Sequence, residues 1–276
     1  MSVSLLILTK NEEQDLPGCL KSVEWCDDVH LYDSCSTDRT AEIAAAAGAK
    51  VTQRRFDNWS AHQNWGLAHI PFKYPWVLYI DADERVSDGL RQAALAAGTP
   101  EAPESAFRLR RRDFFGDGTW LKYAQISPFY LRLFRPEKMR YERLVNPVSI
   151  VDGPVGEIEG FLDHYPFSKG IGFWLERHIN YADLEAKTIL ENRVKGGEFS
   201  FVKAVTEKDF TARRFHQKEF FYRLPGRPLI KWLYMMGLRR AFLDGTAGVT
   251  YATLQSIYEY FIVLKQREME REKRKS

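Results

Sequence analysis

Residues 77–84 read Val77-Leu78-Tyr79-Ile80-Asp81-Ala82-Asp83-Glu84, so that four apolar residues run directly into a cluster of carboxylates. Near-continuous apolar runs are typical of buried strands in parallel sheets, and ligands bind just beyond the carboxyl ends of such strands. Carboxylates are hard oxygen ligands that suit Mg²⁺ or Mn²⁺, and these ions complete their shells with water and substrate phosphates. The stretch therefore predicts an enzyme for a phosphorylated, nucleotide-linked substrate. The alternative is that the acids cap the next helix or stay solvated.

The first hundred residues alternate between strand and helix patterns. Strands are predicted at 3–8, 29–32, 50–54 and 76–80. Helices are predicted at 12–23, 40–47, 60–69 and 87–97. Thr37 is the predicted N-cap of the second helix, and Gly48 is its C-terminal stop. This alternation predicts an α/β fold with a doubly wound, mostly parallel sheet and helices on both faces.

After residue 100 the pattern changes. Further strands are predicted at 107–115, 129–134 and 153–164. From Gly170 onward the pattern is mostly helical, with helices at 171–193, 199–222, 229–243 and from 249 into a charged tail. We therefore expect a C-terminal helical extension, and three regions at 1–100, 101–168 and 169–276.

Composition narrows the class of protein. The chain has 276 residues, enough for one large or two small domains. Its three cysteines lack the paired spacing of a disulfide framework or a zinc site, which predicts a reducing, cytoplasmic setting. No run of about 18 apolar residues marks a transmembrane helix, and no secretory signal peptide is expected. A net charge of +3 is too small to indicate nucleic-acid binding.

Polar turns follow three of the predicted strands. Thr9-Lys10-Asn11-Glu12 ends the first strand, residues 33–38 end the second, and Asp81-Ala82-Asp83 ends the fourth. Because the carboxyl ends of parallel strands meet at one edge of a sheet, these turns should converge there. Small polar side chains and free N–H groups at helix starts suit a phosphate or a base. The alternative is that each turn merely caps a helix.

Together these motifs resemble the family 2 glycosyltransferases, which have the GT-A fold. The resemblance rests on the order and spacing of Leu8–Glu12, Asp33–Thr40, Asn64 and Leu78–Glu84. Within the family the chain is similar to bacterial enzymes that extend lipopolysaccharide core or capsule-type glycans. Ala241–Gly245 and Tyr258–Lys265 resemble the C-terminal helices of that subgroup.

The resemblance implies a reaction. A sugar would pass, with inversion, from a nucleotide diphosphate sugar, foremost a UDP-sugar, to a glycan or lipid-linked acceptor. Residues 1–100 would form the nucleotide-sugar-binding half, and 101–168 would supply strands and loops on the acceptor side. Residues 169–276 would form the helical region, which is a candidate membrane-facing part because of the basic and aromatic residues described below.

The resemblance also implies roles for single residues. Those that would bind the nucleotide are Thr9, Asn11, Glu12, Asp33, Asn64 and Asp81. Asp81 and Asp83 would hold Mg²⁺ or Mn²⁺, with Asp83 as the direct ligand and hence a catalytic residue. The cation would neutralise charge on the departing nucleotide diphosphate, which is Lewis-acid catalysis.

An inverting transfer also needs a general base near the acceptor hydroxyl. Related enzymes carry a His-Glu pair after an Arg-Leu-Phe-Arg segment, and here Arg132–Arg135 is followed by Tyr141-Glu142. Glu142 is therefore the predicted base, although Tyr replaces the preceding His. A second register sets Asn146-Pro147 against the pair and leaves no carboxylate there. In a third interpretation, Glu142 is only a surface partner of a nearby arginine.

His164 follows the apolar residues Phe161 and Leu162 near the end of a predicted strand. In several GT-A enzymes a downstream histidine completes the metal shell, so His164 is a candidate metal ligand by resemblance. The alternative is a structural histidine whose hydrogen bonds are satisfied within the fold.

Residues 213–240 hold eight Lys or Arg residues and one acidic residue, Glu219, interleaved with aromatic side chains. Arg223, Arg227 and Lys231 are candidate contacts for the donor diphosphate or for anionic lipid head groups. The second option predicts a peripheral protein at the inner face of the plasma membrane. Helices with solvated basic faces are the alternative. Nucleic-acid binding is disfavoured because no recognised motif accompanies the basic residues.

Two other functions stay open. A nucleotidyltransferase also uses acidic metal ligands on an α/β sheet, but it would normally show a glycine-rich, basic phosphate loop, and Thr9–Glu12 contains no glycine. A non-catalytic nucleotide-sugar-binding or scaffold protein is the other rival. The retained Asp81 and Asp83 argue against it, whereas the atypical Tyr141-Glu142 leaves it open.

Overall fold

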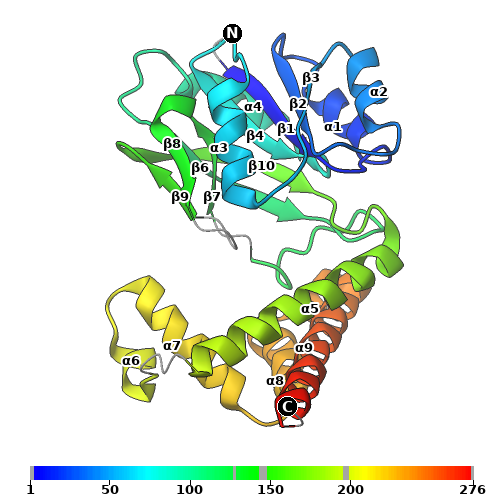
Figure 1. Ribbon diagram of the computed structural model, residues 1–276, viewed down its shortest axis with the longest axis vertical. Coiled ribbons are helices and arrows are strands. Elements are labelled where there is room, and N and C mark those ends of the chain that lie inside the picture. Colours follow the sequence, from blue (N-terminus) through cyan, green and yellow to red (C-terminus); the bar gives the residue numbers. More distant parts are fainter. Residues whose placement is uncertain (1–2, 127–128, 143–147, 195–198, 275–276) are drawn as a thin grey trace. The chain divides into compact units, whose positions relative to one another are not determined.

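The computed structural model describes residues 3–126, 129–142, 148–194 and 199–274, shown in Figure 1. These residues divide into two compact units. Met1–Trp120 and Ile126–Ser168 form the first, which we call the sheet unit. Leu121–Gln125 and Lys169–Ser276 form the second, which we call the helical unit.

The sheet unit alternates strands and helices at first and then consists mainly of strands. Its strands are β1 (Val3–Thr9), β2 (Val29–Asp33), β3 (Lys50–Gln53), β4 (Trp76–Asp81), β5 (Glu84–Val86), β6 (Ala106–Asp113), β7 (Phe129–Phe134), β8 (Met139–Glu142), β9 (Val148–Val151) and β10 (Val155–His164). Its helices are α1 (Leu16–Ser22), α2 (Thr40–Ala46), α3 (Trp59–His69) and α4 (Asp88–Ala97), with a 3₁₀ turn at Pro136–Lys138. The predicted strands are confirmed with small shifts at their ends, and β5, β8 and β9 are additional.

The sheet is mixed but mostly parallel, as predicted. Its strand order is β3-β2-β1-β4-β7-β6-β10-β5. β1 pairs in parallel with β2 and β4, and β2 pairs in parallel with β3. β6 and β10 are also parallel to one another, whereas β7 and β5 run antiparallel to their neighbours. Consequently β1, β2, β4, β6 and β10 all end at one edge, which we call the carboxyl edge.

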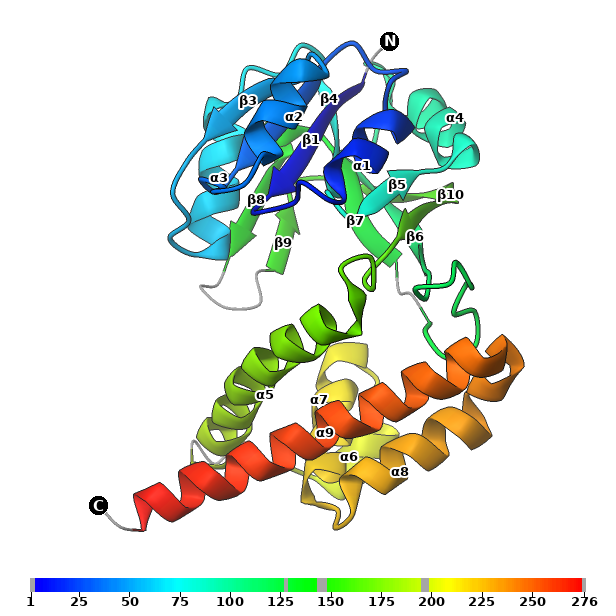
Figure 2. The same cartoon turned by 90° about the vertical axis from the view of Figure 1, so that its right-hand side faces the viewer.

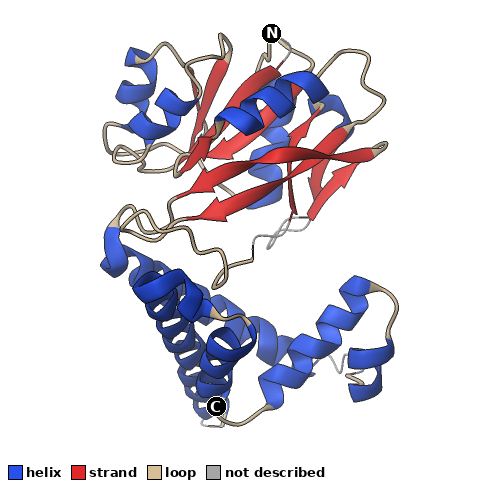
Figure 3. Ribbon diagram, turned by 180° about the vertical axis from the view of Figure 1, so that it is seen from behind, coloured by secondary structure: helices blue, strands red, loops and turns tan. Residues whose placement is uncertain are grey.

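Helices cover both faces of the sheet (Figure 3), so that predicted layering is also confirmed. On one face Leu5 and Leu78 belong to a core that α1, α2 and α4 complete. On the other face the neighbouring residues Leu6 and Val77 pack with α3 and the β8–β9 hairpin. Successive strand residues point to opposite faces, so burial on both sides requires the continuous apolar runs seen in the sequence.

Two local predictions at the carboxyl edge are wrong. The first helix begins at Leu16 rather than near Glu12, because Asn11 adopts a left-handed conformation with φ of 56° and the chain turns there. Thr37 does not cap α2, whose N-cap position is Arg39. Instead the backbone N–H of Thr37 donates to the side-chain oxygen of Asn11 at 2.8 Å, which joins the first two polar turns.

The helical unit consists of helices and one short segment from the middle of the chain. Its helices are α5 (Gly170–Val194), α6 (Phe201–Thr206), α7 (Phe210–Arg223), α8 (Arg227–Leu233) and α9 (Gly245–Lys273). A π-helical turn at Tyr234–Leu238 follows α8, and a 3₁₀ turn at Ala241–Asp244 precedes α9. Figure 2 shows α8 running alongside α9.

Two predicted helices of this unit are divided. The predicted helix at 199–222 breaks into α6 and α7, because Asp209 caps α7 by accepting a hydrogen bond from the N–H of Ala212. The predicted helix at 229–243 breaks at Arg240, which has a left-handed φ of 56°. Asp244 then accepts hydrogen bonds from the N–H groups of Tyr123 and Ala124, which ties segment 121–125 to this unit. Within the described ranges, no helix has the length and apolar character needed to cross a bilayer.

Candidate functional site

Five strands deliver polar residues to the carboxyl edge of the sheet. Thr9, Asp33 and Asp81 end β1, β2 and β4, as the sequence predicted. Asp113 ends β6 and His164 ends β10, and these two residues are direct register partners. Because β5 pairs antiparallel with β10, Glu84 lies opposite His164 on the other side. The topology therefore gathers acidic and basic groups from distant parts of the chain at one place.

Asp33 organises the first two turns from a fully buried position. Its carboxylate accepts hydrogen bonds from the hydroxyl of Thr9 at 3.0 Å and from the amide of Gln53 at 2.9 Å. It also accepts from both the backbone N–H and the hydroxyl of Ser36, at 2.8 Å and 2.5 Å. These four contacts match the acceptor capacity of a carboxylate. Asp33 therefore fixes the conformation of the turn that follows β2.

The turn after β1 is joined to the turn after β2 by its own backbone. The N–H of Asn11 donates to the hydroxyl of Ser36, and the N–H of Glu12 donates to the hydroxyl of Thr40, each at 2.8 Å. The ammonium of Lys10 donates hydrogen bonds to the backbone carbonyls of Ser34 and Cys35 in the second turn. Thr9, Asn11 and Glu12, which were predicted to bind the nucleotide, thus belong to two turns that hydrogen bonds join beside Asp33.

Asn64 has a different set of contacts. Its amide donates to the backbone carbonyl of Tyr141 and accepts from the backbone N–H of the same residue, both at 2.8 Å. The side chain therefore acts like one further strand residue that holds β8 in place. As placed, Asn64 positions the strand that carries Glu142.

Asp81 lies at the mouth of the edge, with 38% of its side chain exposed. Its carboxylate accepts a hydrogen bond from the hydroxyl of Tyr79 at 2.7 Å and one from the guanidinium of Arg132 at 2.9 Å. Its backbone N–H donates to Glu84 at 2.8 Å. The acidic turn is therefore folded back onto a buried carboxylate and a buried cation.

Glu84 and Arg132 form the buried part of this network. Glu84 is fully buried, and its carboxylate lies 3.1 Å from the guanidinium of Arg132 and 3.6 Å from that of Arg111. Burial raises the pKa of Glu84, an effect that Arg132 opposes and Asp81 reinforces. The guanidinium of Arg132 also stacks over the ring of Tyr79, with a separation of 4.3 Å. Without the guanidinium of Arg132, the carboxylates of Asp81 and Glu84 would lose the positive charge that they share.

His164 bridges Asp83 and Asp113. Its Nδ1 lies 2.5 Å from Asp113 and its Nε2 lies 3.3 Å from Asp83. Although burial lowers it, the hydrogen bonds with the two carboxylates raise the pKa of His164 to about 9. Both ring nitrogens therefore lie against carboxylates, and the role of His164 as a metal ligand stays a prediction. As placed, His164 orients Asp83.

The cluster forms a continuous chain of alternating charges. In order its members are Asp81, Arg132, Glu84, Arg111, Asp113, His164 and Asp83. Carboxylates therefore stand at both ends and exceed the cations by one. Asp83, at one end, has 21% of its side chain exposed. The arrangement holds Asp81 and Asp83 at the surface of the carboxyl edge. The cations of the chain neutralise the negative charge of Glu84 and Asp113 beneath them.

Sequence reasoning missed Arg111 and Asp113, and it quoted Glu84 and Arg132 within motifs without giving either a role in the site. A signal exists for two of them, since Arg111 and Asp113 stand two residues apart at the end of a strand and hence on one face. Arg132 belongs to the quoted Arg-Leu-Phe-Arg segment. Its contact with Asp81 at the end of β4 depends on the register in which β7 pairs with β4, which the sequence does not specify.

Glu142 ends β8 with 54% of its side chain exposed, and it lies 3.1 Å from the guanidinium of Arg140. The contact is that of a surface ion pair, one of the interpretations that the sequence left open. It also leaves the carboxylate accessible to an acceptor. The alternative register at Asn146-Pro147 lies outside the described residues.

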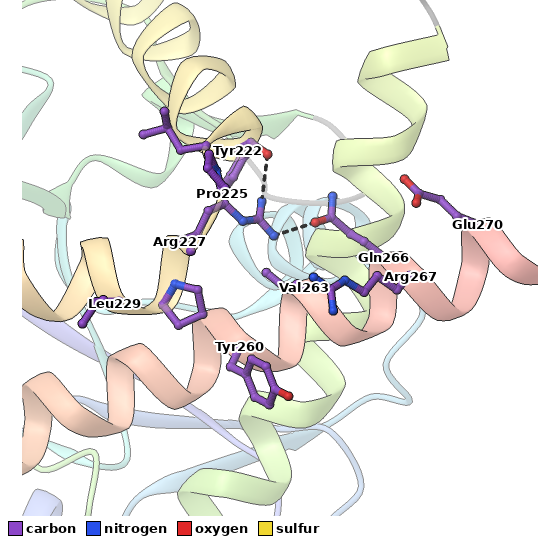
Figure 4. Close-up of a pocket in the computed structure, with 12 residues that line it drawn as sticks. Tyr222, Pro225, Arg227, Leu229, Tyr260, Val263, Gln266, Arg267 and Glu270 are labelled. Carbon is purple, nitrogen blue, oxygen red and sulfur yellow. Dashed lines mark hydrogen bonds between the residues drawn. The ribbon is translucent and has the colours of Figure 1, made fainter.

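The three candidate cations of the helical unit differ from one another. Arg227 is 3% exposed, and its guanidinium contacts Glu259 at 3.2 Å, Gln266 at 2.6 Å and the carbonyl of Tyr222 at 3.3 Å (Figure 4). It is thus engaged within its own unit.

Arg223 stacks over the ring of Phe199 at 4.0 Å and remains exposed. Burial lowers the pKa of Lys231. Among the described residues, no group of three or more His, Cys, Asp or Glu is arranged to hold a metal ion.

Comparison with known proteins identifies the family to which this chain is similar. The family model described as "Glycosyl transferase family 2" matches residues 4–155, more than half of the chain. The lipopolysaccharide core biosynthesis glycosyltransferase LpsC of Rhizobium meliloti is 29% identical over 174 residues, which cover 60% of this chain and 63% of LpsC. An uncharacterized glycosyltransferase of Rickettsia typhi is 26% identical over 234 residues, covering 77% of each chain.

Coverage of the relatives is partial. The chain spans 21%, 63% and 30% of the lengths of the first three curated relatives that it matches. Among solved structures, TarS 1–349 of S. aureus in complex with UDP aligns over 100% of this chain and 92% of its own. The TM-score of that alignment is 0.46 and its sequence identity is 16%.

Proposed function

The chain belongs to glycosyl transferase family 2, and on this premise we propose that it transfers a sugar from a nucleotide diphosphate sugar to a glycan or glycolipid acceptor. The transfer inverts the anomeric centre, and a divalent cation assists departure of the diphosphate. The acceptor is a lipopolysaccharide-type or capsule-type glycan, a proposal that the similarity to LpsC supports. UDP-sugars are the first donors to test.

One observation carries this proposal. Two acidic groups, Asp81 and Asp83, are held at the surface of the carboxyl edge by cations beneath them, next to the interlocked turns after β1 and β2. Ligands of open α/β sheets bind at this edge. Paired carboxylates beside polar turns suit a nucleotide that carries a diphosphate and a hard cation.

A divalent cation suits the residues present. The carboxylates of Asp81 and Asp83 are hard oxygen ligands, and 38% and 21% of their side chains are exposed. These two residues would hold the ion, while water and diphosphate oxygens would complete its shell. When bound, the ion neutralises negative charge that develops on the departing nucleotide diphosphate.

The other residues of the edge position these groups. Arg132 orients Asp81 through a hydrogen bond, and His164 orients Asp83. Asp33 accepts hydrogen bonds from the N–H and the hydroxyl of Ser36 and so fixes the turn after β2, which would border the nucleotide. Glu142 removes the proton from the acceptor hydroxyl, a role for which its exposure is suitable.

The test measures release of nucleoside diphosphate from a panel of sugar nucleotides, with Mn²⁺ and a bacterial glycan or glycolipid extract as acceptor. Asp83→Asn should lower the rate about a thousandfold, because it removes a charged ligand. Asp88→Asn is the matched control, since Asp88 lies five positions further on with 90% of its side chain exposed. Equal loss in both variants, or none in either, contradicts the assignment of the site.

Glu142→Gln separates the base from the rest of the site. The variant should bind donor as wild type does and turn over about a hundredfold more slowly. Unchanged turnover excludes Glu142 as the base. Donor binding without turnover on any acceptor would instead favour the non-catalytic nucleotide-sugar-binding or scaffold protein.

A further inference from the structure

Five large apolar side chains on α8 and on the two turns that follow it are at least half exposed. They are Leu229 (62% exposed), Leu233 (54%), Leu238 (80%), Phe242 (51%) and Leu243 (50%). We call these residues the apolar row. Single exposed leucines are common on soluble proteins, but five within one short segment form a patch of the kind that marks an interaction site.

The backbone keeps the row together. Leu229 and Leu233 are four residues apart on α8 and hence on one face. Leu238 is five residues further on, but the intervening turn is π-helical, and its wider winding brings the fifth residue back toward that face. Arg240 then adopts a left-handed conformation, and Phe242 and Leu243 follow on the next turn. π-Helical turns occur frequently at functional positions.

The charged residues within the segment that carries the row are mostly basic. Between Leu224 and Tyr258 the sequence contains a single acidic residue, Asp244. Asp244 is 8% exposed and accepts hydrogen bonds from two backbone N–H groups, so it contributes little to the surface. Lys231, Arg239 and Arg240 occupy the same stretch, and Arg240 is exposed. Lys231 and Arg239 are half-buried, and the guanidinium of Arg239 donates to the carbonyl of Tyr123. We call these three residues the basic border, of which Arg240 is the exposed member.

The side of α8 opposite the row is fixed to α9. Arg227 at its start is buried and forms an ion pair with Glu259 of α9 at 3.2 Å. Ser256 of α9 donates to the carbonyl of Pro228 at 2.7 Å. A cavity of about 480 Å³ opens beside Leu229, bordered by Tyr260 and Arg267 (Figure 4). The row thus stands on a rigid support rather than on a loose segment.

We propose that the apolar row and its basic border dock the helical unit on an anionic lipid bilayer. Apolar side chains of this size enter the boundary between head groups and acyl chains, while nearby Lys and Arg residues attract anionic head groups. A neutral bilayer would accommodate the apolar row but would not attract the basic border. An acidic protein surface would attract the basic border but would not accommodate the apolar row. The proposal is independent of the sugar transfer, and a soluble acceptor analogue should react without any membrane.

The test is co-sedimentation of the full chain with vesicles of phosphatidylcholine alone or with phosphatidylglycerol added. Binding should require the anionic lipid and weaken as salt rises, because salt screens the charges. The double variant Leu233→Glu/Leu238→Glu should bind about tenfold or more weakly. Arg240→Asn, which tolerates the left-handed backbone, should weaken binding about fivefold.

Leu184→Glu is the matched control. Leu184 lies on α5 of the same unit with 52% exposure, between Asp183 and Glu185, and its variant should bind vesicles as wild type does. The proposal is overturned if wild type does not bind anionic vesicles, or if the double variant binds them equally well. A dimer that the double variant dissolves, without vesicle binding by wild type, would identify a second copy of the chain as the occupant and overturn it too.

Discussion

The sheet carries a buried group of charges at each end, and the two groups are balanced differently. At the amino end, Asp28 is fully buried and accepts hydrogen bonds from Ser4, from Lys50 and from the backbone N–H of Lys73, between 2.5 Å and 2.8 Å. One carboxylate there is surrounded by donors. At the carboxyl edge, carboxylates outnumber the cations and two of them reach the surface.

The pKa values follow from this difference. Although burial raises it, hydrogen bonds from Lys50 and Ser4 hold the pKa of Asp28 at about 2. At the carboxyl edge burial raises the pKa of Glu84, and the pKa of His164 is raised to about 9. The amino end stabilises its charge and so serves the fold. The carboxyl edge holds its perturbed groups directly beneath two accessible carboxylates, and perturbed pKa values of this kind cluster at functional sites.

The largest expected effect comes from removing the central cation of the carboxyl edge. Arg132→Met should lower the free energy of unfolding by about 4 kcal/mol, because Asp81 and Glu84 lose a shared buried partner. Chemical denaturation measures this loss. Arg132→Lys keeps the charge and should cost less. Equal stability of Arg132→Met and wild type would show that the charge chain does not hold the edge together.

A smaller loss is expected at the amino end. Asp28→Ala should cost about 3 kcal/mol, since Ser4, Lys50 and the N–H of Lys73 lose an acceptor. The same denaturation experiment applies, with nucleotide binding measured on the folded fraction. If the two ends have separate roles, binding per folded molecule stays unchanged. A specific loss of nucleotide binding would remove the distinction between the ends.

The smallest expected effect is the dependence of stability on pH, which differs between the two ends of the sheet. The folded pKa of Asp28 lies below its ordinary 3.8, so its contribution is present above 3.8 and is lost as pH falls through about 2. That contribution is about 2 kcal/mol. The folded pKa of His164 lies above its ordinary 6.5, so its contribution is present below 6.5 and is lost as pH rises through about 9.

Unfolding curves measured across pH should therefore show an acid limb and an alkaline limb. Asp28→Asn should flatten the acid limb, and His164→Gln should flatten the alkaline one. A variant that changed the limb assigned to the other end would contradict these assignments.

The sequence predicts which strand ends form the carboxyl edge, but it does not predict the buried charged network beneath them. Strand patterns and polar turns place Thr9, Asp33 and Asp81 at one edge, because parallel connections impose that arrangement. The pairing of β6 with β10 brings Asp113 to His164 across 51 residues, and no local pattern specifies such a register. The charge chain beneath Asp81 and Asp83 therefore becomes visible only in the fold.

The helical unit shows the same limit in another form. Its helices are predictable from periodicity, whereas the break at Arg240 depends on a left-handed residue that sequence patterns assign to glycine. Arg227 is a candidate ligand in the sequence and a buried ion-pair partner in the structure. Basic composition indicates charge but does not indicate which cations face outward.

The most direct measurement is the thermal stability of the wild-type chain and of Asp83→Asn with nucleoside diphosphates, in the presence and absence of Mn²⁺. One nucleotide should stabilise wild type only when Mn²⁺ is present, by an amount that grows with ligand concentration. Asp83→Asn, while folded, should lose this metal-dependent stabilisation. Metal-dependent stabilisation of Asp83→Asn equal to that of wild type, or stabilisation of neither protein by any nucleotide, would contradict the assignment of the carboxyl edge as the donor site.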